Sequence, residues 1–206
     1  MAAIDDNEIH QIVQRVLAQV TGQAQPSAPV ASAPVASAPV PAAPQAVPQP
    51  ESKPTVAKVV AIGADHGGFD LKENLRGYIA ELGFDVRDMG TYNQNPVDYP
   101  EFAPAVARLV STGKAWRGIM IDGAGIGSCI VANKVPGVRA GMAYDISSAS
   151  NSREHNDTNV LTLGAGLIGV NLARQIVKTW LTTEFGGGRH APRVDKITAV
   201  EKQYLK

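Results

Sequence analysis

Residues 118–133 read Gly-Ile-Met-Ile-Asp-Gly-Ala-Gly-Ile-Gly-Ser-Cys-Ile-Val-Ala-Asn. The apolar run at 119–121 is typical of a buried parallel strand, and it ends at an acidic residue, Asp122. Three alternating glycines follow, and glycine both adopts positive φ and lets a ligand approach the main chain. Residues 128–133 then have the composition of a helix start. The stretch predicts a strand, a turn with exposed backbone and a helix, although a tight turn that binds nothing fits the glycine spacing equally well.

The same alternation of apolar runs and helical patterns continues from residue 58 to the end of the chain. The expected strands cover residues 58–64, 84–88, 119–121, 138–143 and 160–163. Helical patterns follow them at residues 70–82, 98–112, 128–133, from 146, at 170–181, and after Arg193. Strands that alternate with helices in this way predict an α/β fold, in which a parallel sheet is covered on both faces.

Composition limits the kinds of partner and compartment. Lys plus Arg and Asp plus Glu each number 19, so no basic field exists to recruit nucleic acid or anionic lipid. The single cysteine, Cys129, excludes an intramolecular disulfide and argues against a thiolate zinc site. The sequence has no apolar run long enough to span a membrane, and acidic residues stand near its start where a secretory signal would carry positive charge. We therefore expect a cytoplasmic protein with neither a nucleic-acid nor a membrane partner.

The first 56 residues differ from the rest. Apolar side chains at helical spacing predict an amphipathic helix within residues 1–22, and they are Ile9, Ile12, Val13, Val16, Leu17 and Val20. A helix this short is marginal alone in water, so its apolar stripe implies a partner surface. Nine of the 14 prolines lie between Pro26 and Pro54, which predicts a disordered, extended Pro/Ala-rich linker over residues 23–56. The globular domain is then expected over residues 57–206.

A short amphipathic helix on a proline-alanine tether resembles the encapsulation peptides that direct cargo enzymes into bacterial microcompartments. The resemblance implies that residues 7–20 bind a shell protein and that the protein resides in the microcompartment lumen. The alternative is a helix that docks on its own globular domain or on a sister chain. The length of the tether favours a separate surface, because local docking does not need it.

Chemically useful side chains gather near the predicted strand ends. Asp65 and His66 follow the first strand, Asp122 ends the third, and His155 lies in an adjacent loop. Open α/β sheets bind ligands in a crevice at the strand ends, so one crevice is expected to hold these residues together. Taken singly, the two aspartates would equally serve as helix caps, and His155 as a surface histidine.

Two arginines suggest where an anion binds. Arg189 and Arg193 follow the glycines 186–188, and a pair of guanidinium groups four residues apart suits a phosphate. They could equally be solvated, or paired with Glu184 and Asp195.

Several separate motifs occur in a fixed order along residues 59–206. They are Gly-Ala-Asp-His-Gly-Gly-Phe at 63–69, Leu-Lys at 71–72, Asp-Tyr-Pro at 98–100, Gly-Ala-Gly-Ile-Gly at 123–127, Ala-Asn-Lys at 132–134, His-Asn-Asp-Thr-Asn-Val at 155–160, and Gly-Gly-Arg-His at 187–190. With these motifs the domain resembles the ribose-5-phosphate isomerase B and galactose-6-phosphate isomerase family.

This resemblance implies a Rossmann-like three-layer sandwich around a five-stranded parallel sheet. It also implies a homodimer, or a tetramer built from such dimers, with active sites shared between subunits and with no metal or organic cofactor. The reaction would be aldose–ketose isomerisation of a sugar phosphate through a cis-enediolate, most simply ribose 5-phosphate to ribulose 5-phosphate. The carbon acid in such a reaction needs a positioned base, and the oxyanion needs fixed donors.

Matching positions carry the roles that the resemblance implies. Asp122 is the candidate base, His155 assists ring opening, and Asp65 joins them in the catalytic set. The expected substrate-binding residues are His66, Tyr99, Gly123, Ala124, Gly125, Gly127, Ser128, Asn156, Arg189 and Arg193.

The chain departs from the family pattern where the chemistry is expected. Asp122 stands where many members have a cysteine base, and Ser128 stands where others have a glutamate. Ala124 replaces a common threonine, and Gly166 replaces a common arginine. The only thiol, Cys129, is displaced from the base position and is expected in helix packing. Two hypotheses follow: an isomerase that uses Asp122, or a domain without isomerase activity that serves as a sugar-phosphate-binding or assembly module.

Overall fold

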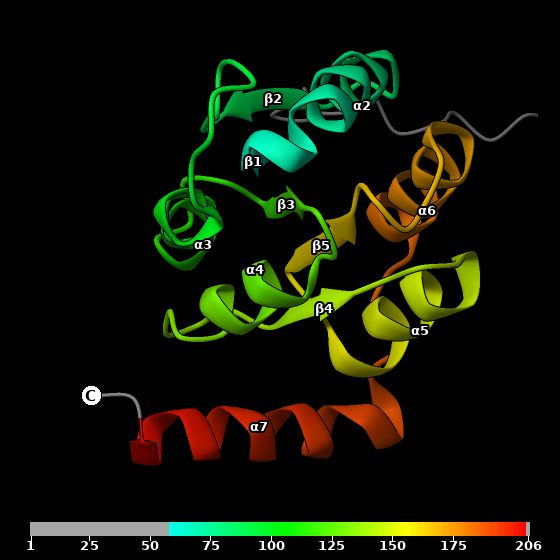
Figure 1. Ribbon diagram of the computed structural model, residues 1–206. Coiled ribbons are helices and arrows are strands. Elements are labelled where there is room, and N and C mark those ends of the chain that lie inside the picture. The colour runs from blue at the N-terminus through cyan, green and yellow to red at the C-terminus, as the bar shows by residue number, and fades with distance from the viewer. Residues whose placement is uncertain (1–57, 205–206) are drawn as a thin grey trace, which may run out of the picture. The chain divides into compact units, whose positions relative to one another are not determined.

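The computed structural model describes residues 58–204 (Figure 1). The helix expected within residues 1–22 and the linker expected over 23–56 lie outside the described residues. They remain predictions. None of the described helices is both long enough and apolar enough to cross a bilayer.

Five parallel strands form one sheet. They are β1 (Val59–Ala64), β2 (Asp85–Asp88), β3 (Arg117–Asp122), β4 (Ala140–Met142) and β5 (Val160–Gly164). Their order across the sheet is β2-β1-β3-β5-β4, so β3 is central. Strands β3 and β5 are buried along their whole length, which explains their almost continuous apolar sequence. The expected five-stranded parallel sheet is confirmed.

Helices cover both faces of this sheet, which confirms the three-layer arrangement (Figure 1). They are α2 (Phe69–Glu81), α3 (Tyr99–Ser111), α4 (Ile126–Ala132), α5 (Ile146–Asn156), α6 (Val170–Thr182) and α7 (Ala191–Tyr204). Side chains alternate along a strand, so the sheet has two separate apolar faces. One face packs against α2, α5 and α6, and the other against α3 and α4.

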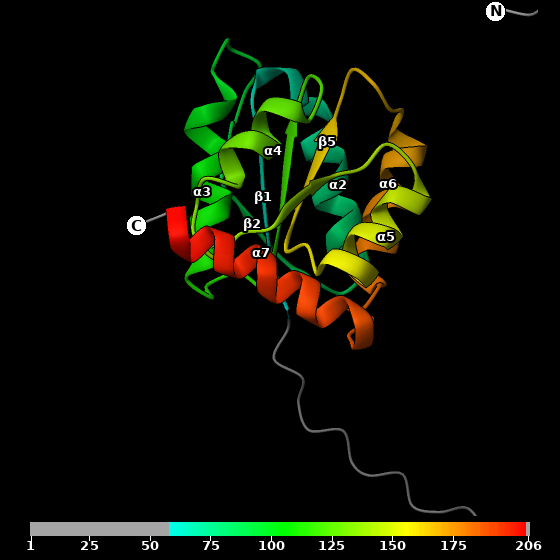
Figure 2. The ribbon, with the colours of Figure 1, turned by 90° about the horizontal axis from the view of Figure 1, so that it is seen from below.

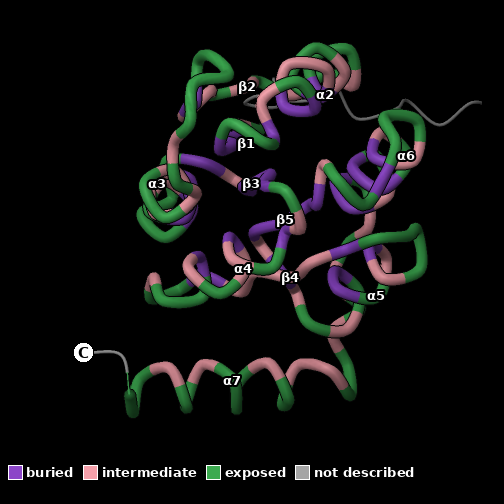
Figure 3. The backbone as a smooth tube through the Cα atoms, viewed as in Figure 1, coloured by how far each residue is buried: buried purple, intermediate pink, exposed green. Residues whose placement is uncertain are grey.

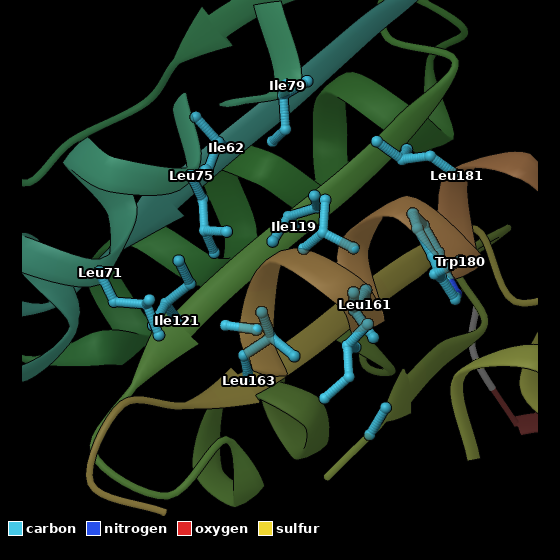
Figure 4. Close-up of a cluster of buried hydrophobic side chains, with 14 of the residues drawn as sticks. Ile62, Leu71, Leu75, Ile79, Ile119, Ile121, Leu161, Leu163, Trp180 and Leu181 are labelled. Carbon is cyan, nitrogen blue, oxygen red and sulfur yellow. The ribbon is translucent and has the colours of Figure 1, made fainter. Parts of the chain in front are cut away.

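The larger of the two cores joins β1, β3 and β5 to α2 and α6 (Figure 4). Its members from the sheet include Ile62, Ile119 and Leu161, all fully buried. Trp180 of α6 is also fully buried, and its indole N–H donates a hydrogen bond of 3.0 Å to the Thr158 hydroxyl. This packing fixes the central strands, and therefore the loops at their ends.

Several boundaries differ from the sequence predictions, among them the start of α7, which begins at Ala191 and not after Arg193. The helix after the glycines begins at Ile126 instead of residue 128, directly after Gly125, whose left-handed conformation, with φ of 79°, is readily adopted by glycine. Strand β4 spans only Ala140–Met142, because it is an edge strand that pairs with β5 alone.

Helix α7 lies along one side of the domain, next to α4, β4 and α5 (Figure 2), and Figure 3 colours it intermediate or exposed throughout. It has no buried residue, and its apolar side chains Ile197, Val200 and Tyr204 are 46%, 57% and 72% exposed. A cavity of about 530 Å³ lies between this helix and the segment around β4. A polar contact also holds the helix, because the amide of Gly137 donates a 2.8 Å hydrogen bond to the Glu201 carboxylate.

Candidate active site

Asp65 lies immediately after β1 and starts a 3-10 turn over His66–Gly68. One of its carboxylate oxygens, Oδ1, accepts a 3.0 Å hydrogen bond from the Gly68 amide. The side chain is nearly enclosed, with 7% of the residue's surface exposed. Burial raises the pKa of Asp65 above its ordinary value of 3.8, and the charge of Asp122 adds to the rise, while the Gly68 amide opposes it. This carboxyl group therefore binds a proton more readily than an exposed aspartate.

Asp122 ends β3, and its carboxylate turns back into the glycine loop that follows. Its Oδ1 accepts hydrogen bonds from the amides of Ala124, at 2.8 Å, and Gly125. Its Oδ2 accepts from the Ser128 amide at 2.9 Å and from the Ser128 hydroxyl at 2.5 Å. A carboxylate offers about four acceptor positions, so these donors use its whole capacity. The loop is wrapped around this side chain.

The loops after β1 and β3 touch each other. A methyl group placed on Gly67 would lie 3.7 Å from the amide nitrogen of Gly123. A side chain at Gly68 is excluded, because its Cβ would lie 2.4 Å from the carbonyl oxygen of Ile121. The two aspartates therefore lie close together at the carboxyl ends of β1 and β3, as expected from their places in the sequence.

Tyr99 brings the start of α3 over the glycine loop. A Cβ atom on Gly127 would lie 2.4 Å from the Tyr99 Cζ atom and 2.8 Å from its hydroxyl oxygen. Glycine at this position therefore lets the phenol ring lie against the loop backbone. His66 is anchored nearby, with Nδ1 2.8 Å from the carbonyl oxygen and 3.2 Å from the amide nitrogen of Val97. The expected residues Asp65, His66, Tyr99 and 122–128 form one cluster.

The loop after β5 holds the glycine loop from the other side, a feature that sequence reasoning missed. The amide of Ala165 donates a 2.8 Å hydrogen bond to the Asp122 carbonyl, and the amide of Gly166 donates a 2.9 Å bond to the Gly123 carbonyl. Gly164 lies against Ala124, where a Cβ atom would be 2.6 Å from the carbonyl oxygen. The sequence did carry a sign of this contact, because glycines after the fifth predicted strand allow two backbone segments to come close together.

A second cluster contains the remaining expected residues. His155 and Asn156 end α5, and together with Arg189, His190 and Arg193 they line a hollow of about 440 Å³. The imidazole rings of His155 and His190 stack with their centroids 4.1 Å apart. Partial desolvation lowers the pKa of His190 below its ordinary value of 6.5, and the neighbouring His155, Arg189 and Arg193 lower it further. The hollow is therefore a cationic site with a histidine that favours its neutral form.

The two clusters lie at opposite ends of the strands: the first at the carboxyl end and the second at the amino end. This corrects the expectation of a single crevice within one chain. Asp122 pairs with Gly164 at the carboxyl end of β5, whereas Asn156 lies just before Val160, where β5 begins. The four residue-to-residue steps from Val160 to Gly164 span about 13 Å. Helix α5 follows the carboxyl end of β4 and leads back to the start of β5, so its last residues, His155 and Asn156, lie at the amino end of the strands.

Cys129 lies outside both clusters. Its thiol makes a 3.5 Å contact with the Ala140 carbonyl oxygen of β4, and burial raises its pKa above the ordinary value of 9.0. A thiol held neutral in this way is a poor proton acceptor. Among residues 58–204, no three acidic, histidine or cysteine side chains come together as a metal site would require.

The sequence model of the Ribose/Galactose Isomerase family matches residues 60–197. The chain belongs to this family. Ribose-5-phosphate isomerase B of Escherichia coli is 44% identical over 146 residues, which cover 71% of this chain and 98% of that protein. D-erythrulose-4-phosphate isomerase of Pectobacterium atrosepticum is also 44% identical, with 70% and 95% covered.

A solved structure agrees with the sequence relatives. Ribose-5-phosphate isomerase B of Clostridium thermocellum superimposes with a TM-score of 0.70 at 49% identity, and the match covers 71% of this chain and 99% of that one. Members of the Ribose/Galactose Isomerase family are aldose–ketose isomerases, and this chain is an enzyme of that class. The matched range includes both clusters.

Proposed function

We propose that the domain interconverts ribose 5-phosphate and ribulose 5-phosphate. The names of the relatives in Escherichia coli and Clostridium thermocellum support this choice of substrate. The observation that carries the proposal is the pair of enclosed carboxylates, Asp65 and Asp122, beside a glycine loop at the carboxyl edge of the sheet. Isomerisation needs a base that removes a proton from one carbon and returns it to the next, and carboxylates supply such bases.

In the proposed mechanism Asp122 is the base. Its carboxylate removes the proton from C2 of the open-chain aldose, and the electrons of the C–H bond form a C1–C2 double bond as negative charge develops on O1. A proton moves from O2 to O1, the base returns its proton to C1, and C2 becomes the carbonyl carbon of the ketose. The amides of Gly123 and Gly127 are the proposed donors to the enediolate within the loop, with Asn156 as a further donor.

The second cluster supplies the remaining roles in this proposal. Arg189 and Arg193 bind the phosphate, and His155 assists ring opening. These residues lie at the amino end of the strands, whereas Asp122 lies at the carboxyl end. We therefore propose that the second cluster of one protomer completes the first cluster of its partner in a homodimer. The exposed apolar side chains of α7 supply surface for such an interface.

Complementation tests this arrangement. Asp122→Asn and His155→Ala are each expected to abolish turnover of ribose 5-phosphate. A refolded equimolar mixture should recover about a quarter of wild-type activity, because half of the dimers are mixed and each mixed dimer has one intact site. A mixture as inactive as its parents, with mixed dimers verified by mass, refutes the shared site. Retained turnover in Asp122→Asn refutes the assignment of the base.

One observation favours a second candidate function, a sugar-phosphate-binding module without turnover. All acceptor positions of Asp122 are occupied by the loop, so the carboxylate must give up a donor before it takes a proton. Calorimetry separates the two functions. Binding of ribose 5-phosphate, with no ketose formed from any of several pentose and tetrose phosphates, supports the module.

We further propose that the protein is microcompartment cargo, bound to a shell protein through residues 7–20 and tethered by residues 23–56. The helical spacing of apolar residues and the length of the tether support this proposal. Deleting residues 1–54 should leave isomerase activity intact while the protein no longer co-purifies with assembled shells. Unchanged co-purification of the truncated protein refutes the targeting role.

A further inference from the structure

We propose that Ser128 is a positioning residue of the isomerase reaction, which acts through Asp122 and does not touch the sugar. Its hydroxyl donates to the Asp122 carboxylate in the resting enzyme and accepts from the same group once the carboxylate carries the proton of the substrate. This inference rests on the proposed function, because it assigns a partner to the proposed base.

The geometry excludes direct contact between Ser128 and a ligand. The residue is completely buried, and both its amide and its hydroxyl point at the same oxygen, Oδ2 of Asp122. The 2.5 Å separation between the two side-chain oxygens is at the short end of the range for a hydroxyl bonded to a charged oxygen. The expected substrate contact of Ser128 therefore becomes a contact with the base.

Ser128 differs from the other donors to Asp122 in one chemical respect. The amides of Ala124, Gly125 and Ser128 itself are fixed by the backbone and can only donate. The hydroxyl can rotate about its C–O bond, and its oxygen can accept as well as donate. Of the four donors, it is the one that can change role.

Proton transfer requires such a change. When Oδ2 takes the proton from carbon, the new O–H needs an acceptor, and a backbone N–H facing it would repel it. If the Ser128 hydroxyl turns its hydrogen toward a main-chain carbonyl of the preceding turn, as serine side chains in helices do, its oxygen can accept from the acid. When the proton returns to carbon, the hydroxyl turns back. The proton leaves and re-enters Asp122, and no net charge moves to Ser128.

The proposal predicts a specific kinetic signature for Ser128→Ala. Loss of one hydrogen bond to a charged group is expected to lower kcat about 10- to 100-fold, with KM for ribose 5-phosphate changed less than about twofold. The ionised form of Asp122 loses a charge-assisted donor, so the acid limb of the kcat/KM profile should move to higher pH by about one unit. Ser128→Thr restores the hydroxyl and should restore the position of the acid limb.

Ser152→Ala is the matched control, because it removes another buried serine hydroxyl far from Asp122. The Ser152 hydroxyl donates a 2.9 Å hydrogen bond to the Ala149 carbonyl and accepts from Thr158. This variant should show a similar thermal destabilisation with an unmoved pH profile. If Ser128→Ala behaves like Ser152→Ala in the pH profile, the inference is overturned.

A second readout does not depend on turnover. In full-length protein labelled at the aspartate carboxyl carbons, the resonance missing from Asp122→Asn identifies Asp122. Its titration midpoint should move to higher pH in Ser128→Ala and stay in place in Ser152→Ala. An unmoved midpoint overturns the inference whatever the activity. A moved midpoint, in a protein that turns over no sugar phosphate, supports the Ser128–Asp122 pairing while it removes the proposed function.

Discussion

Replacing Asp122 by asparagine should destabilise the fold, whereas the same replacement at Asp65 should stabilise it. An asparagine at 122 keeps one acceptor oxygen and turns an NH2 group toward two of the donors that now face a carboxylate. The less destabilising orientation directs the NH2 group at Ser128. The Ser128 hydroxyl can rotate to accept from it, while the Ser128 backbone amide is left unpaired. One buried N–H group is left unpaired, and the remaining hydrogen bonds are weaker because the acceptor is no longer charged. Together these changes lower the free energy of unfolding by about 2–4 kcal/mol. In a domain of this size, that loss lowers Tm by roughly 5–15 °C.

The opposite sign at Asp65 follows from its raised pKa. The folded protein binds the Asp65 proton more tightly than the unfolded chain does, so the charged form costs stability at every pH above the raised value. Below the ordinary value of 3.8 the group is neutral in both states and the cost disappears. An asparagine at 65 can still accept from the Gly68 amide. Asp65→Asn should therefore raise Tm by a few degrees at pH 7 and by progressively less toward pH 4.

Thermal unfolding followed by circular dichroism at pH 7, 5.5 and 4 measures both effects. Asp85→Asn is the control, because Asp85 is exposed on β2 and should leave Tm within about 1 °C. A normal Tm for Asp122→Asn would show that its carboxylate does not hold the loop together. A lowered Tm for Asp65→Asn at pH 7 would contradict the burial argument.

Three further substitutions test the frame around the site. Gly68→Ala would place Cβ 2.4 Å from a carbonyl oxygen of β3, so we expect a loss of more than about 3 kcal/mol in urea unfolding and little native protein at 37 °C. Lys72→Met removes a fully buried ammonium that contacts the Asp88 carboxylate at 2.7 Å, and it should cost about 3 kcal/mol by the same measurement. Arg117 donates hydrogen bonds to the carbonyls of Trp180, at 2.5 Å, and Thr183, so Arg117→Lys should lose about 1–3 kcal/mol because lysine cannot reach both.

The apolar pattern was sufficient to predict the buried strands β1, β3 and β5, because each is a short apolar run with glycine or an acidic residue at its carboxyl end. The closeness of Asp65 and Asp122 followed from their positions at the carboxyl ends of two parallel strands. Membership of the isomerase family, predicted from separate motifs, is confirmed by the match over residues 60–197.

The sequence pattern could not predict which way a side chain points, or at which end of the strands a residue near a loop lies. The turn of Asp122 into its own loop depends on where three amides point, which only the left-handed Gly125 and the early start of α4 reveal. The position of His155 was assigned by its closeness to a strand in the sequence. In a strand–helix–strand unit, the start of the helix lies at the carboxyl end of the strands and the end of the helix lies at their amino end. His155 stands at the end of its helix, and this distinction would have separated it from Asp122 in advance.

The occupied glycine loop also decides which inhibitors suit this enzyme. Hydroxamates and other anionic mimics of an enediolate bind tightly where unpaired N–H groups await a negative charge. Here the amides of Ala124, Gly125 and Ser128 already donate to a resident carboxylate, so an incoming anion is left with the proposed donors of Gly123 and Gly127 and meets a like charge. A phosphorylated hydroxamate should therefore gain little over a neutral amide of the same length, a selectivity opposite to that of a site with a neutral residue at position 122.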